Sequence, residues 1–165
     1  MIGVYWGAFD PPTVAHIAII NEALKQIPLK KLIVVVNNHQ YKKYVYPLQD
    51  RIKLVEQMLG LHDRERIEIM WQDETTKLDY DSIKKKVNGP LCAIAGYDAY
   101  QAWVAHSTHE ERLKYDSIAV VPRGDELPKL FDHNAFLLPI AAEYKYVSSS
   151  KKRRFSTASK EKKRS

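Results

Sequence analysis

The distribution of apolar residues along the chain predicts parallel strands that alternate with helices. Five short apolar runs have the length of strands, and they occupy residues 2–6, 32–36, 66–71, 91–95 and 118–121. The second, fourth and fifth runs are apolar throughout. Continuous apolar runs are typical of parallel strands that are covered on both faces of the sheet.

Apolar residues at helical spacing fill the intervals between these runs. One stripe recurs at steps of three and four residues until Pro28 ends it, and it consists of Ile17, Ile20, Leu24 and Ile27. A second helix is expected over 48–59, because Pro47 suits a first turn and Gly60 suits a helix end. Further helices are expected at 80–87 and 98–104, and the polar segment 106–115 should end the last helix or form a loop.

This alternation predicts an α/β fold, namely a Rossmann-like, doubly wound parallel sheet of five to six strands with helices on both faces. In such sheets ligands bind beyond the carboxyl ends of the strands, at the point where the strand order reverses. Candidate chemistry is therefore expected in the segments that follow the apolar runs.

The positive charge of the chain is confined to its last residues. Of 165 residues 45% are hydrophobic and 28% charged, which suits one globular domain. Residues 151–165 hold eight of the 26 basic residues and one of the 20 acidic residues, a net of +7. The remainder holds 18 basic and 19 acidic residues, a net of −1. We therefore expect a folded domain over 1–153 and a basic, disordered tail over 154–165, and little affinity of the folded surface for nucleic acid.

The sequence argues against a disulfide-bonded, zinc-binding, secreted or membrane-spanning protein. Cys92 is the single cysteine, so an internal disulfide and a cysteine-based zinc site are excluded, and its apolar surroundings predict a buried thiol in a reducing compartment. The first residues do not resemble a secretory signal, and no apolar run is long enough to span a bilayer. A cytoplasmic location is expected, or a nuclear one if the tail acts as an address in a eukaryote. His106 and His109 lack the H-E-x-x-H spacing, so we expect no metal site built from protein side chains.

The turn after the first predicted strand could bind an anion. Gly7 permits a close approach of the backbone to a ligand, and Thr13 is a good N-cap three residues before His16. An imidazole in the first helical turn would add a donor to the exposed backbone N–H groups and the positive end of the helix dipole. The alternative is an ordinary capped helix with an incidental histidine. Neither a G-x-G-x-x-G nor a Walker A motif occurs in the chain.

A second candidate segment comes much later in the chain. Ser148, Ser149 and Ser150 precede Arg153, so that three hydroxyls and a guanidinium follow one another within about two helical turns. Serine hydroxyls and backbone N–H groups can bind phosphate oxygens, and arginine can bind them bidentately. The alternative is a serine linker that leads into the tail.

Together the two segments resemble the signatures of the nucleotidyltransferase superfamily. The first resembles G-x-F-D-P followed by (H/T)-x-G-H, although Ala15 stands where the family usually has glycine; the matching residues are Gly7, Phe9, Asp10, Pro11, Thr13 and His16. The second resembles I-S-S-T-x-x-R. The resemblance implies catalytic roles for Thr13, His16 and Arg153. It also implies ATP-binding residues, namely Gly7, Ala8, Phe9, Asp10, His16, Ser148, Ser149, Ser150 and Arg153.

Other segments resemble the nicotinamide- or nicotinate-mononucleotide adenylyltransferases. Gly96 and Asp98 match the family's G-x-D, which holds the ATP ribose, and Arg123 matches an arginine near the nucleotide. Asp98 could instead cap the helix that follows it. The implied acceptor-binding residues are Lys42 and Lys43 for the phosphate, and Trp71 and Trp103 for a sandwich around the pyridine ring. The alternatives are a basic surface loop and two core tryptophans.

The resemblance implies a specific reaction: transfer of AMP from ATP to nicotinate or nicotinamide mononucleotide in NAD biosynthesis, with release of pyrophosphate. Mg²⁺ would bridge the phosphates, the partners would be these small molecules rather than a membrane, and the enzyme could be a homo-oligomer. One alternative is a phosphopantetheine adenylyltransferase or a cytidylyltransferase, but the chain has no R-G-L-R-like and no R-T-x-G-I-S-T-T segment. Another alternative is a non-catalytic nucleotide- or nucleic-acid-binding protein that acts through its tail.

Overall fold

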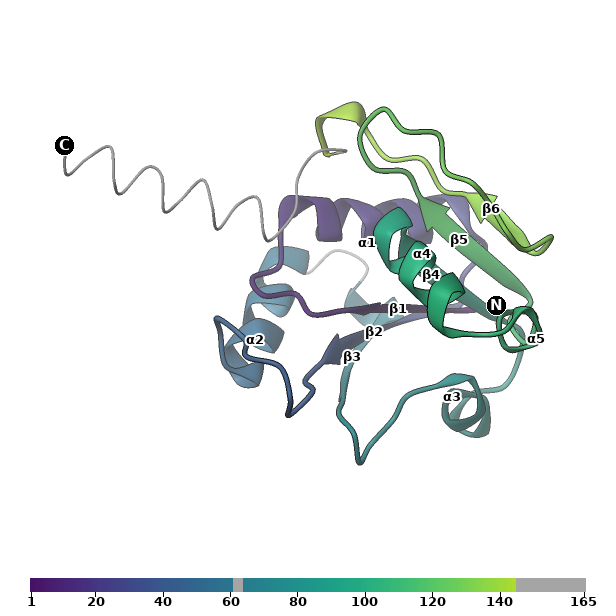
Figure 1. The fold of residues 1–165 in the computed structure, drawn as a ribbon. Coiled ribbons are helices and arrows are strands. Elements are labelled where there is room, and N and C mark those ends of the chain that lie inside the picture. Colours follow the sequence, from purple (N-terminus) through teal and green to yellow (C-terminus); the bar gives the residue numbers. More distant parts are fainter. Residues whose placement is uncertain (61–63, 145–165) are drawn as a thin grey trace.

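The computed structural model describes residues 1–60 and 64–144, which form a six-stranded parallel sheet (Figure 1). The strands are β1 (Ile2–Gly7), β2 (Lys31–Asn37), β3 (Ile67–Gln72), β4 (Leu91–Gly96), β5 (Ser117–Val121) and β6 (Ala135–Leu137). Their order is β3-β2-β1-β4-β5-β6, and all neighbouring pairs are parallel. The order reverses between β1 and β4, as in a doubly wound sheet, so the predicted fold class is confirmed.

Helices cover both faces of this sheet. Two clusters of buried side chains, one on each face, show which helices cover which face. One face carries α1 (Val14–Gln26) and α2 (Leu48–Leu59), and the other carries α3 (Tyr80–Lys86) and α4 (Tyr97–His106). Figure 1 shows α1 behind the sheet and α4 in front of it. None of the helices in the described part of the chain is long and apolar enough to cross a membrane.

The predicted helices and strands are found close to their expected bounds, with two differences. The sixth strand, β6, has three residues, which is too short for a periodic pattern in the sequence. The segment 106–115 is neither a continuous helix nor a simple loop, because Thr108 caps a separate single-turn helix, α5 (His109–Arg112). Pro47 and Gly60 flank α2 as expected, and the φ of +65° at Gly60 favours glycine.

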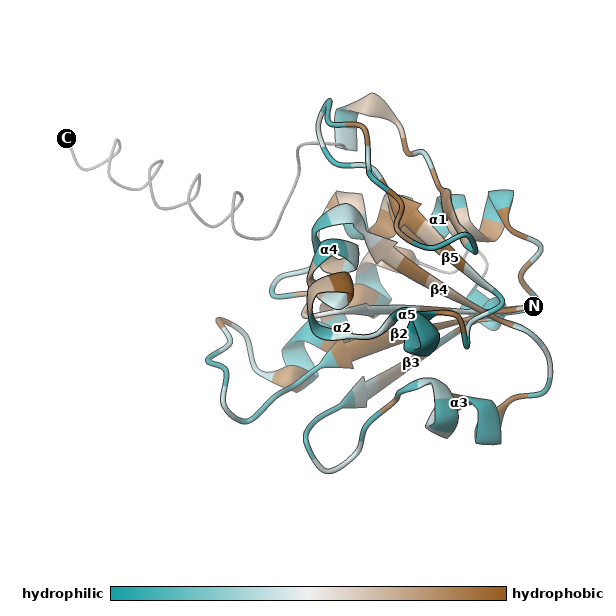
Figure 2. Ribbon diagram, turned by 45° about the vertical axis from the view of Figure 1, so that its right-hand side comes forward, coloured by the Kyte–Doolittle hydropathy of each residue, from teal (hydrophilic) through white to brown (hydrophobic). Residues whose placement is uncertain are grey.

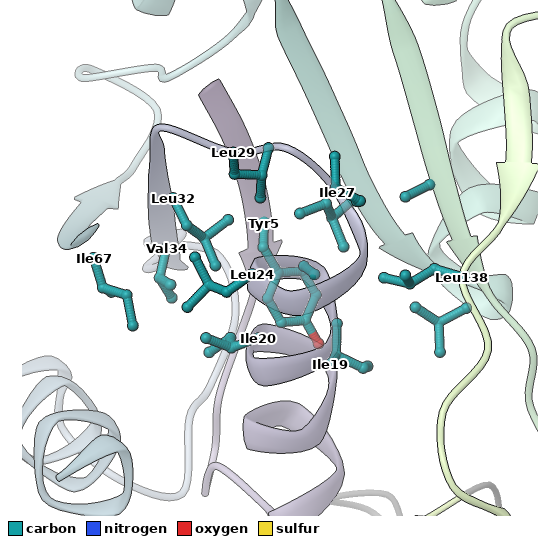
Figure 3. Close-up of a cluster of buried hydrophobic side chains, with 14 of the residues drawn as sticks. Tyr5, Ile19, Ile20, Leu24, Ile27, Leu29, Leu32, Val34, Ile67 and Leu138 are labelled. Carbon is teal, nitrogen blue, oxygen red and sulfur yellow. The ribbon is translucent and has the colours of Figure 1, made fainter. Parts of the chain in front are cut away.

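Alternating side chains of the strands build one hydrophobic core on each face. On the first face, Tyr5 and Val34 pack against Ile20 and Leu24 of α1 (Figure 3). Burial on both faces explains why the inner strands are largely apolar, and Figure 2 shows these brown, hydrophobic strands in the middle of the molecule and the mostly teal, hydrophilic helices α3 and α5 outside them. Cys92 is fully buried in β4, as predicted, and burial raises the pKa of its thiol.

Candidate active site

A cavity of about 240 Å³ opens at the carboxyl ends of β1, β4 and β5. It lies where the strand order reverses, which is the expected ligand position in a doubly wound sheet. The structure brings together here five candidate residues that are far apart in the sequence, namely Gly7, His16, Gly96, Asp98 and Arg123. Tyr144, the last described residue, also lines this cavity, whereas the predicted phosphate-binding residues Ser148, Ser149, Ser150 and Arg153 lie outside the described residues.

The turn between β1 and α1 is held in shape by the buried ring of Phe9. A Cβ atom on Gly7 would lie 2.9 Å from Cζ of Phe9, so this position has no room for a side chain. Phe9 itself adopts a φ of +49°, and its ring contacts the rings of Tyr5 and His16 edge-on, with centroids 5.5 and 4.9 Å apart. Packing therefore fixes the path of the backbone from Gly7 to the start of α1.

His16 has a fixed tautomer because it belongs to a capping box. The side-chain oxygen of Thr13 accepts the N–H of His16 at 3.4 Å, and the N–H of Thr13 donates to Nδ1 of His16 at 2.9 Å. A backbone N–H can only donate, so Nδ1 is the acceptor and the neutral ring carries its proton on Nε2. Burial lowers the pKa of His16 from 6.5 to about 4. The ring is therefore neutral at pH 7 and offers one N–H donor.

Asp10 joins this turn to the loop that precedes α2. Its buried carboxylate accepts the N–H groups of Val45 at 2.7 Å and of Tyr46 at 2.8 Å. Asp10 is not among the residues that line the cavity at the switch point. Asp10 therefore holds the turn after β1 against the loop before α2, and its predicted contact with ATP stays a prediction.

Arg51 is a structural residue whose role the sequence did not reveal. Its fully buried guanidinium donates to the carbonyl oxygens of Ala8 at 2.9 Å, Asn37 at 2.7 Å and Tyr46 at 3.0 Å. Burial lowers the pKa of Arg51, while the charge of Asp10 acts in the opposite direction. The available signal was its position four residues before Val55, on the apolar stripe of the second helix. Arg51 fastens the loops after β1 and β2 to one another.

Asp98 and Arg123 form an ion pair at the cavity. The N-cap of α4 is Gly96, so the alternative in which Asp98 caps this helix is not realised. Both side chains remain well exposed, and their charges offset each other. A bound nucleotide would have to compete with this pair for the carboxylate and for the guanidinium.

A second cavity, of about 310 Å³, lies beside the first, and we call it the aromatic cavity. Its rings are Trp6, Trp103 and Tyr115, and the centroid of Tyr115 lies 6.0 Å from that of Trp6 and 5.5 Å from that of Trp103. Trp6 and Ala99 line both cavities, so the two share a wall. The role of Trp6 was not predicted, although its place at the end of the first apolar run was a usable signal.

The two predicted ring-binding tryptophans do not face each other. Trp71 pairs in register with Val36, whose side chain belongs to the core beneath α1, whereas Trp103 packs against the opposite core. The expected sandwich is therefore not formed, because side chains in a strand alternate between faces and the neighbouring residue, Gln72, is the one that lines the aromatic cavity. Lys42 and Lys43 are exposed in the loop after β2, and phosphate binding by them stays a prediction.

His109, at the start of α5, has a partner other than a metal. Among the residues that the structure describes, no group of three or more His, Cys, Asp or Glu side chains could hold a metal ion. Nδ1 of His109 lies 2.5 Å from the buried carboxylate of Asp132, which also accepts bonds from Arg112 at 2.8 Å and Tyr100 at 2.7 Å. This network fastens the loop after β5 to α4 and α5.

Known proteins place the chain in a family. The model of the cytidylyltransferase-like family matches residues 4–155, a range that contains both signature segments. The chain belongs to the cytidylyltransferase-like family. The resemblance to nucleotidyltransferases expected from the two signatures is thus confirmed.

Relatives of this cytidylyltransferase-like protein carry two different names. A probable nicotinate-nucleotide adenylyltransferase of Buchnera aphidicola is 29% identical over 139 residues, which cover 78% of this chain and 64% of the relative. The chain thus spans somewhat less than two thirds of that protein. A phosphopantetheine adenylyltransferase of Fusobacterium nucleatum is 42% identical over 150 residues, which cover 90% of this chain and 78% of the relative.

Solved structures agree with the fold. The nicotinic acid mononucleotide adenylyltransferase of Plasmodium falciparum, complexed with APC, has a TM-score of 0.72 at 18% identity, covering 93% of this chain and 82% of the other. The same Plasmodium enzyme complexed with NaAD gives a TM-score of 0.70. At this identity the likeness establishes the Rossmann-like fold.

Proposed function

We propose that this cytidylyltransferase-like protein transfers AMP from ATP to a pyridine mononucleotide and releases pyrophosphate. The observation that carries the proposal is the pair of cavities that share Trp6 and Ala99 at the carboxyl ends of β1 and β4. The cavity with His16, Asp98 and Arg123, which we call the nucleotide cavity, offers donors and charges for a nucleotide, and the aromatic cavity offers flat apolar walls for a ring.

In this reaction the acceptor phosphate attacks the α-phosphorus of ATP in line. A new phosphorus–oxygen bond forms while the bond from the α-phosphorus to the bridging oxygen breaks, and pyrophosphate leaves with the electron pair. Negative charge grows on the leaving oxygens, so positioned donors and positioning itself supply most of the catalysis. No nucleophile from the protein is required.

The polar residues of the nucleotide cavity are assigned to ATP. The Nε2–H of His16 donates to a phosphate oxygen, and its neutral state avoids an ion pair that would hold the product. Asp98 accepts from the ribose hydroxyls, and Arg123, released from Asp98, neutralises phosphate charge. The proposal retains the catalytic roles predicted for Thr13 and Arg153.

Magnesium belongs to this proposal as the counter-ion of ATP. The only carboxylate that lines the nucleotide cavity, within the described ranges, is Asp98, and the proposal assigns it to the ribose hydroxyls. This donor set suits an ion held mainly by phosphate oxygens and water, which would withdraw charge from the phosphates when bound.

One experiment tests the reaction and its acceptor. The protein is incubated with magnesium-ATP and, in separate reactions, nicotinamide mononucleotide, nicotinate mononucleotide and phosphopantetheine, and with magnesium-CTP and choline phosphate. Pyrophosphate is quantified and the nucleotide product is identified by mass spectrometry. A dinucleotide from a pyridine mononucleotide supports the proposal, and no pyrophosphate with any acceptor refutes an enzymatic role.

Phosphopantetheine is the second candidate acceptor. The observation in its favour is the 42% identity to the Fusobacterium nucleatum protein over 90% of this chain, which exceeds the identity to the Buchnera aphidicola protein. Against it stands the aromatic cavity, since a flexible pantetheine chain does not need three aromatic rings around it. Pyrophosphate release with phosphopantetheine alone would decide for this candidate.

A further inference from the structure

The indole and amide groups that line the aromatic cavity are already engaged in hydrogen bonds. The indole N–H of Trp6 donates to the carbonyl oxygen of Leu78 at 2.9 Å. The amide of Gln72 donates to Oδ1 of Asn37 at 2.7 Å and accepts the N–H of Leu78 at 2.8 Å. None of the described residues that line this cavity is lysine, arginine or histidine, and Asp79 is the only charged one.

Asp79 has a fixed position at the wall of this cavity. Its carboxylate is the N-cap of α3 and accepts the N–H of Ser82 at 3.0 Å. The bond to Ser82 lowers the pKa of Asp79, so the group is ionised at neutral pH. The N-terminus of α3 is therefore already occupied by a negative charge and is a poor place for a second anion.

The space next to the aromatic cavity is negative as well. An adjoining cavity shares Asp79, Trp103 and Tyr115 with it and adds Asp81 and Glu111 against one cation, Lys114. Lys114 is committed to Asp81 at 3.6 Å. Burial raises the pKa of the Tyr115 phenol, and the charges of Asp79 and Asp81 add to this effect, so the ring experiences the negative field.

We infer that Asp79 makes the aromatic cavity select an acceptor ring that carries a neutral substituent over one that carries a carboxylate. The inference rests on the proposed function. The ring nitrogen of a pyridine mononucleotide is quaternary and positive, so a carboxamide leaves the ring with a net charge of about +1, whereas a carboxylate brings it to about zero. Aromatic faces and a nearby carboxylate attract the first, and like charges at Asp79 disfavour the second.

The size of the effect follows from the exposure of Asp79. Asp79 is exposed, and a charge pair in such a position is worth up to about 1 kcal/mol, or about fivefold in binding. We therefore expect kcat/KM to favour nicotinamide mononucleotide over nicotinate mononucleotide by up to about fivefold, mostly through KM.

The test compares Asp79→Asn with the matched control Asp81→Asn. Asparagine is also a good N-cap, so Asp79→Asn should keep α3 folded while the charge is lost. Asp81 is a neighbouring carboxylate that does not line the aromatic cavity. Asp79→Asn should reduce the preference about fivefold, and Asp81→Asn should change it less than about twofold. Calorimetric binding of both mononucleotides gives the same ratio without turnover.

The outcomes separate the inference from the proposed function. A wild-type preference for nicotinate mononucleotide overturns the inference but leaves the proposed function intact, and so does a preference that Asp79→Asn does not change. If the protein neither binds the two mononucleotides nor transfers AMP to them, both the inference and the proposed function are overturned.

Discussion

Two roles of His16 can be separated by substitution. His16→Ala removes the acceptor of the Thr13 N–H and also the Nε2–H that we assign to phosphate. Loss of the capping-box bond should cost about 1 kcal/mol of folding free energy. Loss of a donor to the charge that develops in the transition state should lower kcat about 100-fold or more.

His16→Gln is the matched variant for this experiment. Glutamine at the third position of a helix completes a capping box with threonine, so this variant should unfold in urea within about 0.5 kcal/mol of the wild type. Its amide is flexible and lacks the ring that packs against Phe9, so its N–H is not held at the place of Nε2, and kcat, measured by pyrophosphate release, should still fall about tenfold or more. If both variants turn over within about threefold of the wild type, the ring contributes only to the helix start and the proposed role is wrong.

The pH dependence of stability provides a second measurement on the same variants. The pKa of His16 is about 4 in the folded protein and about 6.5 when unfolded, so the unfolded state binds the proton more tightly. The contribution of the neutral His16 ring to the free energy of unfolding is complete above pH 6.5 and is lost as pH falls towards 4, with an upper limit of about 3 kcal/mol. His16→Gln lacks this component, and identical pH profiles for the wild type and the variant would show that the ring is not buried as described.

Three further substitutions test the framework and the nucleotide cavity. Arg51→Met should cost about 3 kcal/mol or more in urea denaturation, since the carbonyl oxygens it serves would lose their donors; a cost below about 1 kcal/mol would contradict that role. Burial raises the pKa of Asp132, but its hydrogen bonds, of which the one from Arg112 is the strongest, lower the pKa below its ordinary value. The ionised carboxylate therefore stabilises the fold above about pH 4, and this stabilisation is lost as pH falls through the folded pKa. Asp132→Asn should therefore cost about 3 kcal/mol at pH 7 and flatten the acid limb of the stability profile, and an unchanged acid limb would speak against the network. Asp98→Asn should raise KM for ATP about tenfold and leave KM for the acceptor unchanged in steady-state kinetics, whereas an effect on the acceptor alone would move this residue to the other substrate.

Much of the fold was predictable because its signals are local. The continuous apolar runs required strands buried on both faces, and Pro47 and Gly60 marked the ends of one helix by backbone preference alone. Thr13 could be recognised as an N-cap because capping depends on residues three positions apart. The prediction allowed a sixth strand but did not locate β6, because three residues, stabilised by pairing with β5, carry no periodicity of their own.

The sequence by itself determined most of the elements and the fold class, and it supplied the candidate residues for a nucleotide site, because periodicity, caps and signature residues all occur within short segments. Only the tertiary structure decided which residues meet. Strand order and the alternation of side chains put Trp71 and Trp103 on opposite faces, joined Asp98 to Arg123, and placed Asp79 in the wall of the aromatic cavity. These outcomes depend on distances between segments far apart in the chain, which no local pattern encodes.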